Sequence, residues 1–375
     1  MSTHPAVVTV TPGGPLQIQH IPTPPIASNQ VKLINQYTAS TPLDLHQADA
    51  HLLVNPPQIL GDSVAGTVLE VGPDVKRLRP GDQVFGFVWR FQAEKAHQLY
   101  VVTEEKLLAK LPPGRSLQEV VVVPDNFVTA WHALSKDLGF DLPWPKPEGY
   151  VSPGKDSWIV VWGGSSSVGM YAIQILRYYG YGNVVTTASK AHHERLVRYG
   201  ASVCLDYRDE GTVERIRDRL KSGPSQRDFV LDCIGSLEGS VRPLARVATT
   251  KGAKVAILLP VIIKDAAPGI RPEYEMDVQA CAAWAQGVEV SGVRTHTYMT
   301  DEFLAERLQP EMMPWAIAEK TVEPNDQIIV EGGTLLERAE RALQLLREKK
   351  VSGGRLVWRV AEEEEVKTAM EQFCS

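Results

Sequence analysis

Short apolar runs separated by turn residues dominate the first part of the chain, from residue 5 to about 124. The runs 31–34 and 64–71 are valine-rich and too short for stable helices, a composition that favours strands. Residues 79–83 (Arg-Pro-Gly-Asp-Gln) place a turn directly before another apolar run, because proline and glycine adopt the φ values that tight turns need. The pattern predicts a compact β-rich domain.

From residue 125 to about 296 the pattern changes to apolar runs that alternate with stretches of helical period. Regular alternation of strands and helices predicts a parallel sheet with helices on both faces. The expected strands are the runs 158–162, 183–187, 202–205, 229–233, 254–259 and 288–293. The chain is therefore predicted to be an α/β protein with a doubly wound sheet.

The remaining segments complete the expected topology. Apolar residues recur at helical spacing over 335–346, and the apolar run 355–360 follows as a final strand. We expect the acidic stretch 362–365 to be solvated. Residues 141–156 contain four prolines and predict an exposed loop, either near an active-site mouth or as a plain surface excursion.

Composition narrows the class of protein. The chain has 375 residues, 43% of them hydrophobic, which is too long for one comfortable core and favours two domains. A net charge of -6 gives no general attraction for nucleic acid or an anionic membrane. No signal-peptide pattern opens the chain, and its longest apolar runs fall far short of the roughly 20 residues that span a bilayer.

The spacing of the cysteines indicates which cellular compartment to expect. The four cysteines are scattered without short spacings, which argues against a disulfide framework or a structural zinc lobe. We expect a cytoplasmic protein with reduced thiols. Cys204, Cys233, Cys281 and Cys374 are the residues concerned.

The most specific motif is the small-residue turn 163–169, which follows an apolar strand and opens an apolar-periodic helix. Such a turn brings a pyrophosphate close to the N–H groups of a helix N-terminus, where the helix dipole favours an anion. Ser166 stands where a middle glycine is usual, but its N–H and hydroxyl are compatible with phosphate binding. The predicted phosphate-binding residues are Gly163, Gly164, Ser165, Ser166, Ser167 and Val168.

The end of the next strand bears on the choice of cofactor. In NAD-binding domains an acidic residue there accepts from the ribose 2′-hydroxyl. This strand ends instead in Ser189 and Lys190, with no carboxylate before Glu194, and Tyr207 follows the third strand. A hydroxyl and an ammonium suit a 2′-phosphate, so NADPH is predicted. The alternative is that Lys190 is one more solvated surface lysine.

With these motifs in place, the chain resembles the medium-chain dehydrogenase/reductase superfamily over nearly its whole length. The segments that carry the resemblance are residues 59–72, 79–84, 158–169 and 351–357. Within the superfamily it resembles the zinc-independent, quinone-oxidoreductase-like branch. More narrowly, residues 128–134, 137–143 and 351–353 resemble those of the fungal trans-acting enoyl reductases that serve polyketide synthases.

The resemblance implies a fold and a set of site residues. It implies a GroES-like catalytic domain from residues 1–124 and 297–375, with a Rossmann NADP-binding domain at 125–296 inserted between them. The pyrophosphate would lie on residues 165–168 and the 2′-phosphate among Ser189, Lys190 and Tyr207. Residues lining the nicotinamide side would be Thr41, Pro42, Leu43, Asp44, Leu258, Leu259, Val351 and Ser352, and Thr129 would lie near the reacting carbonyl.

The chain lacks the metal ligands of its zinc-dependent relatives. Those relatives carry a cysteine at the position of Thr41 and Gly-His-Glu where this chain has Gly61, Asp62 and Ser63. The nearby His46 and His51 have no helical ligand spacing and are expected to be surface or loop residues. We predict that no metal is bound.

Without a metal, a polarised double bond is an easier hydride acceptor than a ketone. The sequence therefore predicts NADPH-dependent reduction of an α,β-unsaturated carbonyl, on a small or carrier-bound acyl substrate and with a polyketide synthase as a possible partner. Thr129 is the candidate donor to the carbonyl oxygen, and its alternative role is that of a strand-end or helix-cap residue. Tyr37, His97, His132 and water all stay open as the proton donor.

Two other functions stay open at this stage. One is a generic quinone or alkenal reductase without a synthase partner. The other is a regulatory protein that binds NADPH without catalysis. Oligomeric state also stays open, because the run 288–293 suits either a pairing edge or a covered strand.

Overall fold

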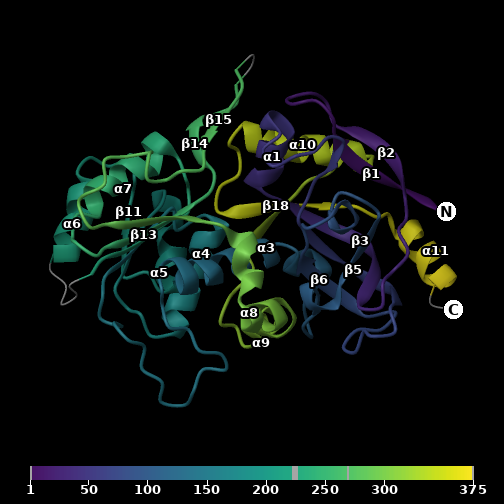
Figure 1. Cartoon of the computed structure of the whole chain (residues 1–375), viewed down its shortest axis with the longest axis horizontal. Helices are drawn as coiled ribbons and strands as arrows, with labels where there is room; N and C mark the ends of the chain where they lie inside the picture. Colours follow the sequence, from purple (N-terminus) through teal and green to yellow (C-terminus); the bar gives the residue numbers. More distant parts are fainter. Residues whose placement is uncertain (1, 222–226, 268–269, 374–375) are drawn as a thin grey trace.

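The computed structural model describes residues 2–221, 227–267 and 270–373, and its two largest sheets lie side by side (Figure 1). One is a six-stranded, wholly parallel sheet in the order β11-β10-β9-β12-β13-β16. This is the strand order of a doubly wound dinucleotide-binding domain. Its strands are β9 (Ile159–Trp162), β10 (Val184–Thr187), β11 (Val203–Leu205), β12 (Phe229–Asp232), β13 (Lys254–Leu258) and β16 (Glu289–Val293). The predicted parallel sheet is confirmed.

The other large sheet combines strands from both ends of the chain. Near the C-terminus β18 pairs antiparallel with β3 near the N-terminus, so the parallel sheet is an insertion between them. The strands are β3 (Gln30–Ser40), β5 (Ser63–Val71), β6 (Gln83–Phe87), β7 (Tyr100–Glu104), β8 (Ala109–Lys110), β17 (Asp326–Ile329) and β18 (Gly354–Arg359). The predicted α/β fold with a separate β-rich part is confirmed, while the boundaries at 124 and 297 stay predictions.

Two smaller sheets complete the strands. β1 (Thr3–Thr9) pairs with β2 (Gln17–Pro22) and β4 (Gln58–Ile59). β14 (Val261–Lys264) and β15 (Glu273–Glu275) form a hairpin that projects from the parallel-sheet part (Figure 1). The sequence pattern did not predict this hairpin.

Helices cover the sheets and join them. The parallel-sheet part carries α4 (Ser167–Tyr178), α5 (His193–Tyr199), α6 (Thr212–Lys221) and α7 (Arg242–Val247). The β-rich part and the junction carry α1 (Pro42–Ala50), α2 (Leu117–Val120), α3 (Pro124–His132), α8 (Glu302–Arg307), α9 (Met313–Ala318), α10 (Leu335–Arg347) and α11 (Glu363–Phe373). Short segments of tighter or wider helix include η3 (Ala133–Asp137), η4 (Lys190–His192) and η6 (Thr295–Thr300).

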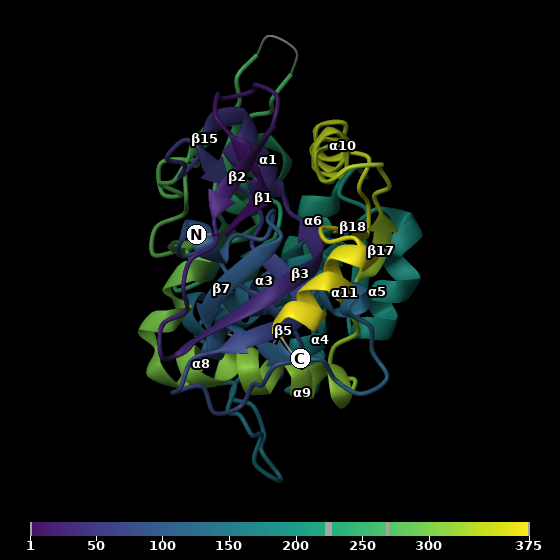
Figure 2. The same ribbon diagram turned by 90° about the vertical axis from the view of Figure 1, so that its right-hand side faces the viewer.

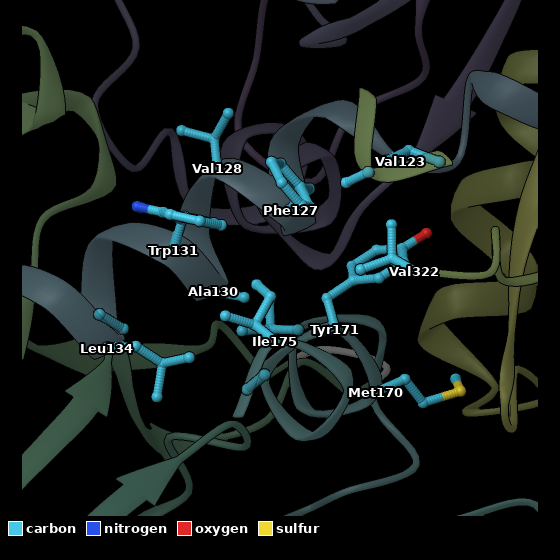
Figure 3. Packing of buried hydrophobic residues seen from close by; sticks show 14 of the residues in the cluster. Val123, Phe127, Val128, Ala130, Trp131, Leu134, Met170, Tyr171, Ile175 and Val322 are labelled. Carbon is cyan, nitrogen blue, oxygen red and sulfur yellow. The ribbon is translucent and has the colours of Figure 1, made fainter. Parts of the chain in front are cut away.

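Helix α3 lies at the centre of the molecule, between the two large sheets (Figure 1). One face carries Phe127 and Trp131, which pack with Tyr171 and Ile175 of α4 in a single buried cluster (Figure 3). Phe127 and Tyr171 are fully buried. The apolar face of α3 therefore joins the inserted part to the β-rich part through a continuous core.

A buried ion pair fixes the other side of α3. Arg355 of β18 pairs with Asp125 in the first turn of α3, and its guanidinium also donates to the carbonyl oxygens of Val122 (3.0 Å) and Ala39 (2.9 Å). The Ser63 hydroxyl donates to the same Asp125 carboxylate at 3.1 Å. The network thus joins β3, β5 and β18 to the central helix.

The acidic stretch of the C-terminal segment is solvated, as predicted, since Glu363, Glu364 and Glu365 are exposed. The helix that begins there was not predicted: α11 lies across the β-rich part beside β5 (Figure 2). Ala369 is buried against Ile34 and Leu69, and Glu362 pairs with Arg338 at 2.7 Å. Cys374 lies outside the described residues, and residues 141–156 form an irregular loop as predicted.

We expect Arg355→Leu to lower the free energy of unfolding by about 3–5 kcal/mol, because it leaves the Asp125 carboxylate buried without a counter-charge. Urea denaturation followed by circular dichroism measures the change. The matched control is Arg242→Leu, which removes an arginine whose side chain is 57% exposed and paired only with Glu238 one helical turn away. That control should change stability by less than about 1 kcal/mol, and an equal loss in both variants would contradict the prediction.

Candidate functional site

The phosphate loop is shaped by three glycines at which a side chain does not fit. Gly163 has φ +82°, a conformation that favours glycine. A Cβ on Gly164 would lie 1.9 Å from Thr186 Oγ1, and one on Gly169 would lie 2.5 Å from the Gly163 carbonyl oxygen. The turn therefore brings β9, β10 and the start of α4 closer together than any side chain allows.

The first turn of α4 presents free amides to this loop. Gly169 N–H donates to the hydroxyl of Ser166, the N-cap residue, and Ser166 N–H donates to the Gly163 carbonyl. Ser166 therefore caps the helix. Its N–H was predicted to be compatible with phosphate binding, but it is already bonded to the Gly163 carbonyl. Within the described chain the amides of Ser167 and Val168 have no such partner, as expected at a helix start. The glycine cradle and these amides fit a dinucleotide pyrophosphate.

The ends of β10 and β11 form the expected ribose side. Because Thr187 and Leu205 are registered partners, Ser189 and Tyr207 leave the sheet side by side. Ser189 is half-buried, Tyr207 is 49% exposed, and the Lys190 ammonium lies 3.4 Å from Asp209 with 70% of its side chain exposed. Lys190 is thus a solvent-facing cation beside the predicted 2′-phosphate position.

Sequence reasoning missed a second cation in this region. Arg208 binds the Asp206 carboxylate through two nitrogens at 2.9 and 2.6 Å and lowers the pKa of that carboxyl far below its usual range. Both Asp206 and Asp209 are therefore paired with cations. The only local signal for Arg208 was its place directly after Tyr207.

The first of the residues predicted to line the nicotinamide side lie at the start of α1. Thr41 N–H donates to one Asp44 carboxylate oxygen at 2.9 Å, and Gly61 N–H donates to the other at 3.0 Å. Burial, with a smaller contribution from nearby Asp62, raises the pKa of Asp44 to about 7. The Asp44 side chain thus stabilises the backbone of this wall, whereas Pro42 is exposed and Leu43 half-buried.

The other predicted wall residues approach from two sides. Leu258 and Leu259 are half-buried at the carboxyl end of β13, where parallel α/β sheets bind ligands. Val351 is half-buried, and the exposed Ser352 hydroxyl lies 2.8 Å from His192 Nε2.

Contacts between the parallel-sheet part and the β-rich part hold the loop that contains Val351 and Ser352. Arg195 of α5 donates to the Gly353 carbonyl at 2.8 Å and pairs with Asp326 of β17. Together with His192 it fixes residues 352–353 against the ribose side. Neither His192 nor Arg195 could be singled out from the sequence, since their partners lie more than a hundred positions away.

Thr129 lies in the middle of α3, so its interpretation as a strand-end or cap residue was wrong. Its hydroxyl donates to the Asp125 carbonyl oxygen at 2.6 Å and lies 3.0 Å from the Thr295 hydroxyl of η6. The side chain is half-buried. The two hydroxyls form a pair between the central helix and the segment that follows β16.

At the position of the zinc ligands of related enzymes the chain has an ion pair. The Lys95 ammonium donates to Asp62 Oδ1 at 2.6 Å, and both side chains are at least 90% buried. Across the described ranges no group of three or more His, Cys, Asp or Glu residues is arranged to hold a metal ion. The donor set here is therefore one carboxylate already neutralised by an ammonium.

The two nearby histidines differ from each other. His46 is buried, and its Nδ1 lies 2.7 Å from the Tyr274 hydroxyl of β15, so the prediction of a surface residue was wrong. Burial lowers the pKa of His46 to about 4. His51 ends α1 in the left-handed conformation, as a loop residue.

The structure also shows the surroundings of the three side chains considered as proton donors. Tyr37 is half-buried on β3. His97 is fully buried beside Trp358, and burial lowers its pKa to about 3. Burial, then the nearby Lys136, lowers the pKa of His132 to about 4. Both imidazoles are thus neutral near pH 7 and are weak acids there.

Comparison with known proteins identifies relatives of this arrangement. The model of the alcohol dehydrogenase GroES-like domain matches residues 27–133. The chain is 34% identical to the trans-enoyl reductase himH of Aspergillus japonicus over 231 residues, which cover 60% of this chain and 64% of that protein. It is 31% identical to the trans-enoyl reductase tazE of Aspergillus terreus over 267 residues, covering 68% of this chain and 85% of that protein.

Longer matches extend the similarity to nearly the whole chain. The trans-enoyl reductase pvhC of Talaromyces variabilis is 28% identical over 367 residues, covering 94% of this chain and 96% of that protein. The crystal structure of an alcohol dehydrogenase superfamily protein from Novosphingobium aromaticivorans superposes with a TM-score of 0.70 at 23% identity, covering 96% of this chain and all of that one. At that identity the superposition supports the fold alone.

We expect Gly164→Ala to weaken dinucleotide binding at least tenfold, because the new methyl group meets Thr186 and displaces the phosphate loop. Titration of nicotinamide fluorescence measures the dissociation constant. Gly182→Ala is the control, since no atom lies within 4 Å of its added Cβ. Unchanged binding in Gly164→Ala would refute the assignment of the loop.

Proposed function

Because the chain belongs to the medium-chain dehydrogenase/reductase superfamily, in its enoyl-reductase-like branch, we propose that it reduces the carbon–carbon double bond of an α,β-unsaturated carbonyl compound with NADPH. The observation that carries the proposal is the phosphate loop, with the free amides of Ser167 and Val168 at the start of α4. The same fold contains the half-buried hydroxyls of Thr129 and Thr295, which lie 3.0 Å apart.

The preference for NADPH over NADH rests on the charges at the ends of β10 and β11. Lys190 is exposed and able to reach a 2′-phosphate, and the Arg208 guanidinium is a second cation nearby. The Asp206 carboxylate is occupied by Arg208, so it is a poor acceptor for a ribose hydroxyl. These charges favour a phosphate-bearing ribose.

The reaction we propose uses no metal. A bound nicotinamide supplies the hydride, which the β-carbon accepts. Thr129 would leave the Asp125 carbonyl oxygen and donate to the substrate carbonyl, and Thr295 would donate to Thr129 in turn. Water serves as the final proton source, since His97 and His132 are neutral near pH 7.

We propose a carrier-bound acyl chain as the substrate and a polyketide synthase as the partner, because the relatives himH, pvhC and tazE are named trans-enoyl reductases. In the part of the chain that the structure describes, no helix is both long and apolar enough to cross a membrane. The second candidate is a quinone or alkenal reductase, which the same loop and threonine pair would also serve. A regulatory NADPH-binding protein would keep the loop without need of that pair.

The deciding experiment follows NADPH oxidation by the purified protein with enoyl thioesters, enones, quinones and aldehydes, with NADH as the comparison cofactor. We expect turnover of enoyl thioesters and a preference for NADPH of at least tenfold in kcat/KM, because a 2′-phosphate gains charge-assisted hydrogen bonds. Turnover of quinones alone would favour the second candidate. Tight NADPH binding without any turnover would favour the regulatory protein.

Thr129→Val should lower kcat for the enoyl substrate about 100-fold and leave the dissociation constant of NADPH unchanged, because it removes one donor to the carbonyl oxygen. Thr129→Ser keeps the hydroxyl and should retain most of the activity. Steady-state kinetics and fluorescence titration separate the two effects. Full activity in the valine variant would remove Thr129 from the mechanism.

A further inference from the structure

The hairpin of β14 and β15 stands apart from the two large sheets, and β15 lies beside α1 (Figure 1, Figure 2). The hairpin has only two strands, and a two-stranded hairpin is marginally stable unless it packs on another part of the protein. β14 begins at Val261, two positions after Leu259 of the predicted nicotinamide side. The hairpin therefore leaves the parallel sheet at the cofactor site and ends on the β-rich part.

The base of the hairpin contacts the phosphate loop through the turn 233–236, which follows β12. Ile262 N–H of β14 donates to the Gly235 carbonyl at 2.6 Å, and a Cβ on Gly235 would lie 2.5 Å from a backbone oxygen at the end of β13. In the same turn the Ile234 side chain lies against Gly163, since a Cβ there would lie 2.5 Å from Ile234 Cδ1. The base is thus closely packed beside the cofactor site.

Beyond its base the hairpin packs on the β-rich part. The Tyr274 hydroxyl of β15 lies 2.7 Å from Nδ1 of His46 in α1, and the two rings meet edge to face with their centroids 4.7 Å apart. Asp265, directly after β14, pairs with Lys349 at 2.7 Å. The first residues of α1 are predicted to face the nicotinamide, and Lys349 lies just before the other predicted segment, 351–352. The hairpin therefore joins both segments to the cofactor-binding part.

Each of these contacts is weak on its own. Burial lowers the pKa of His46 to about 4 and raises that of Tyr274, so near pH 7 the two groups are uncharged and share a neutral hydrogen bond. The side chains of Lys349 and Asp265 are 70% and 56% exposed, and an ion pair between exposed groups contributes little stability. A segment with a closely packed base and weak contacts beyond it can open and close on the microsecond to millisecond timescale.

We propose that the β14–β15 hairpin is a strap across the dinucleotide site, held closed by the contact of Tyr274 with His46, and that it opens for the cofactor to enter and leave. Tyr274 and His46 are positioning residues, because they act through the hairpin and not on the reacting atoms. The inference rests on the cofactor binding of the proposed function but not on the reduction of a double bond.

A strap of this kind predicts a distinctive pair of kinetic effects. The contact of Tyr274 with His46 is made by the chain's own residues, so it forms in the free and in the bound protein alike. If the cofactor exchanges only through the open form, a weaker contact raises the open fraction and speeds binding and release by the same factor. The dissociation constant then stays unchanged. Damage to the binding surface would instead raise that constant and slow binding.

Stopped-flow fluorescence with NADPH measures both rates. In Tyr274→Phe, which removes only the hydroxyl, we expect binding and release to become about fivefold faster, the effect of one buried hydrogen bond. Tyr274→Ala also removes the ring and should speed both at least tenfold. The matched control is Glu273→Ala, on the same strand. The Glu273 side chain is 63% exposed and pairs with Lys264 inside the hairpin, so this variant should leave both rates unchanged.

The outcomes separate the strap from the proposed function. Equal rates in the wild-type protein and in Tyr274→Phe, with NADPH bound by both, would overturn the strap and leave the proposed function intact. A higher dissociation constant with slower binding would also overturn it, because Tyr274 would then belong to the binding surface. If NADPH does not bind the wild-type protein, the strap and the proposed function both fail.

Hydrogen exchange tests the strap in the protein without cofactor. We expect the amides of β15 to exchange about fivefold faster in Tyr274→Phe than in the wild-type protein, because an undocked two-stranded hairpin frays. The amides of β12 in the parallel sheet should exchange equally in both proteins, which shows that the fold is retained. Equal exchange of β15 in the two proteins would contradict a strap held by Tyr274.

Discussion

The buried pair of Arg355 and Asp125 is the constraint on which the rest of the structure depends. The Arg355 guanidinium donates to backbone oxygens of β3 and of the residues just before α3, while Asp125 accepts from Ser63 of β5. Burial raises the pKa of Asp125, and the Arg355 charge opposes that shift. Removing either charge would leave the other without compensation, so the first turn of α3 can take only one position against the β-rich sheet.

That position determines where the chemistry can occur. Asp125 also supplies the carbonyl oxygen to which the Thr129 hydroxyl donates. One ion pair at the start of a helix therefore fixes the candidate catalytic hydroxyl. The apolar face of α3, packed on α4, fixes the phosphate loop relative to that hydroxyl.

The sequence allowed prediction of those features whose cause is local. The parallel strands could be predicted because buried strands are continuous apolar runs, and the phosphate loop because its glycines, strand and helix adjoin. The pairs of Arg355 with Asp125, Lys95 with Asp62 and His192 with Ser352 could not, because their members lie 230, 33 and 160 positions apart. Thr129 was singled out through the resemblance alone, and its position inside α3 was not foreseen. The acidic composition of 362–365 correctly predicted exposure, but helix α11 was not foreseen, because the burial of Ala369 depends on distant residues of the β-rich part.

The carboxylates of this molecule are compensated in two different ways. Around Arg355 and around Lys95 each buried carboxylate faces a cation at hydrogen-bond distance, so these networks are complete in the free protein. Asp137 is half-buried, and its carboxylate lies 3.8 Å from the neutral imidazole of His132 instead of facing a cation. The two cation-paired networks are therefore the buried charges that can hold the central helix and the β-rich part in one arrangement, because removing one partner would leave the other uncompensated.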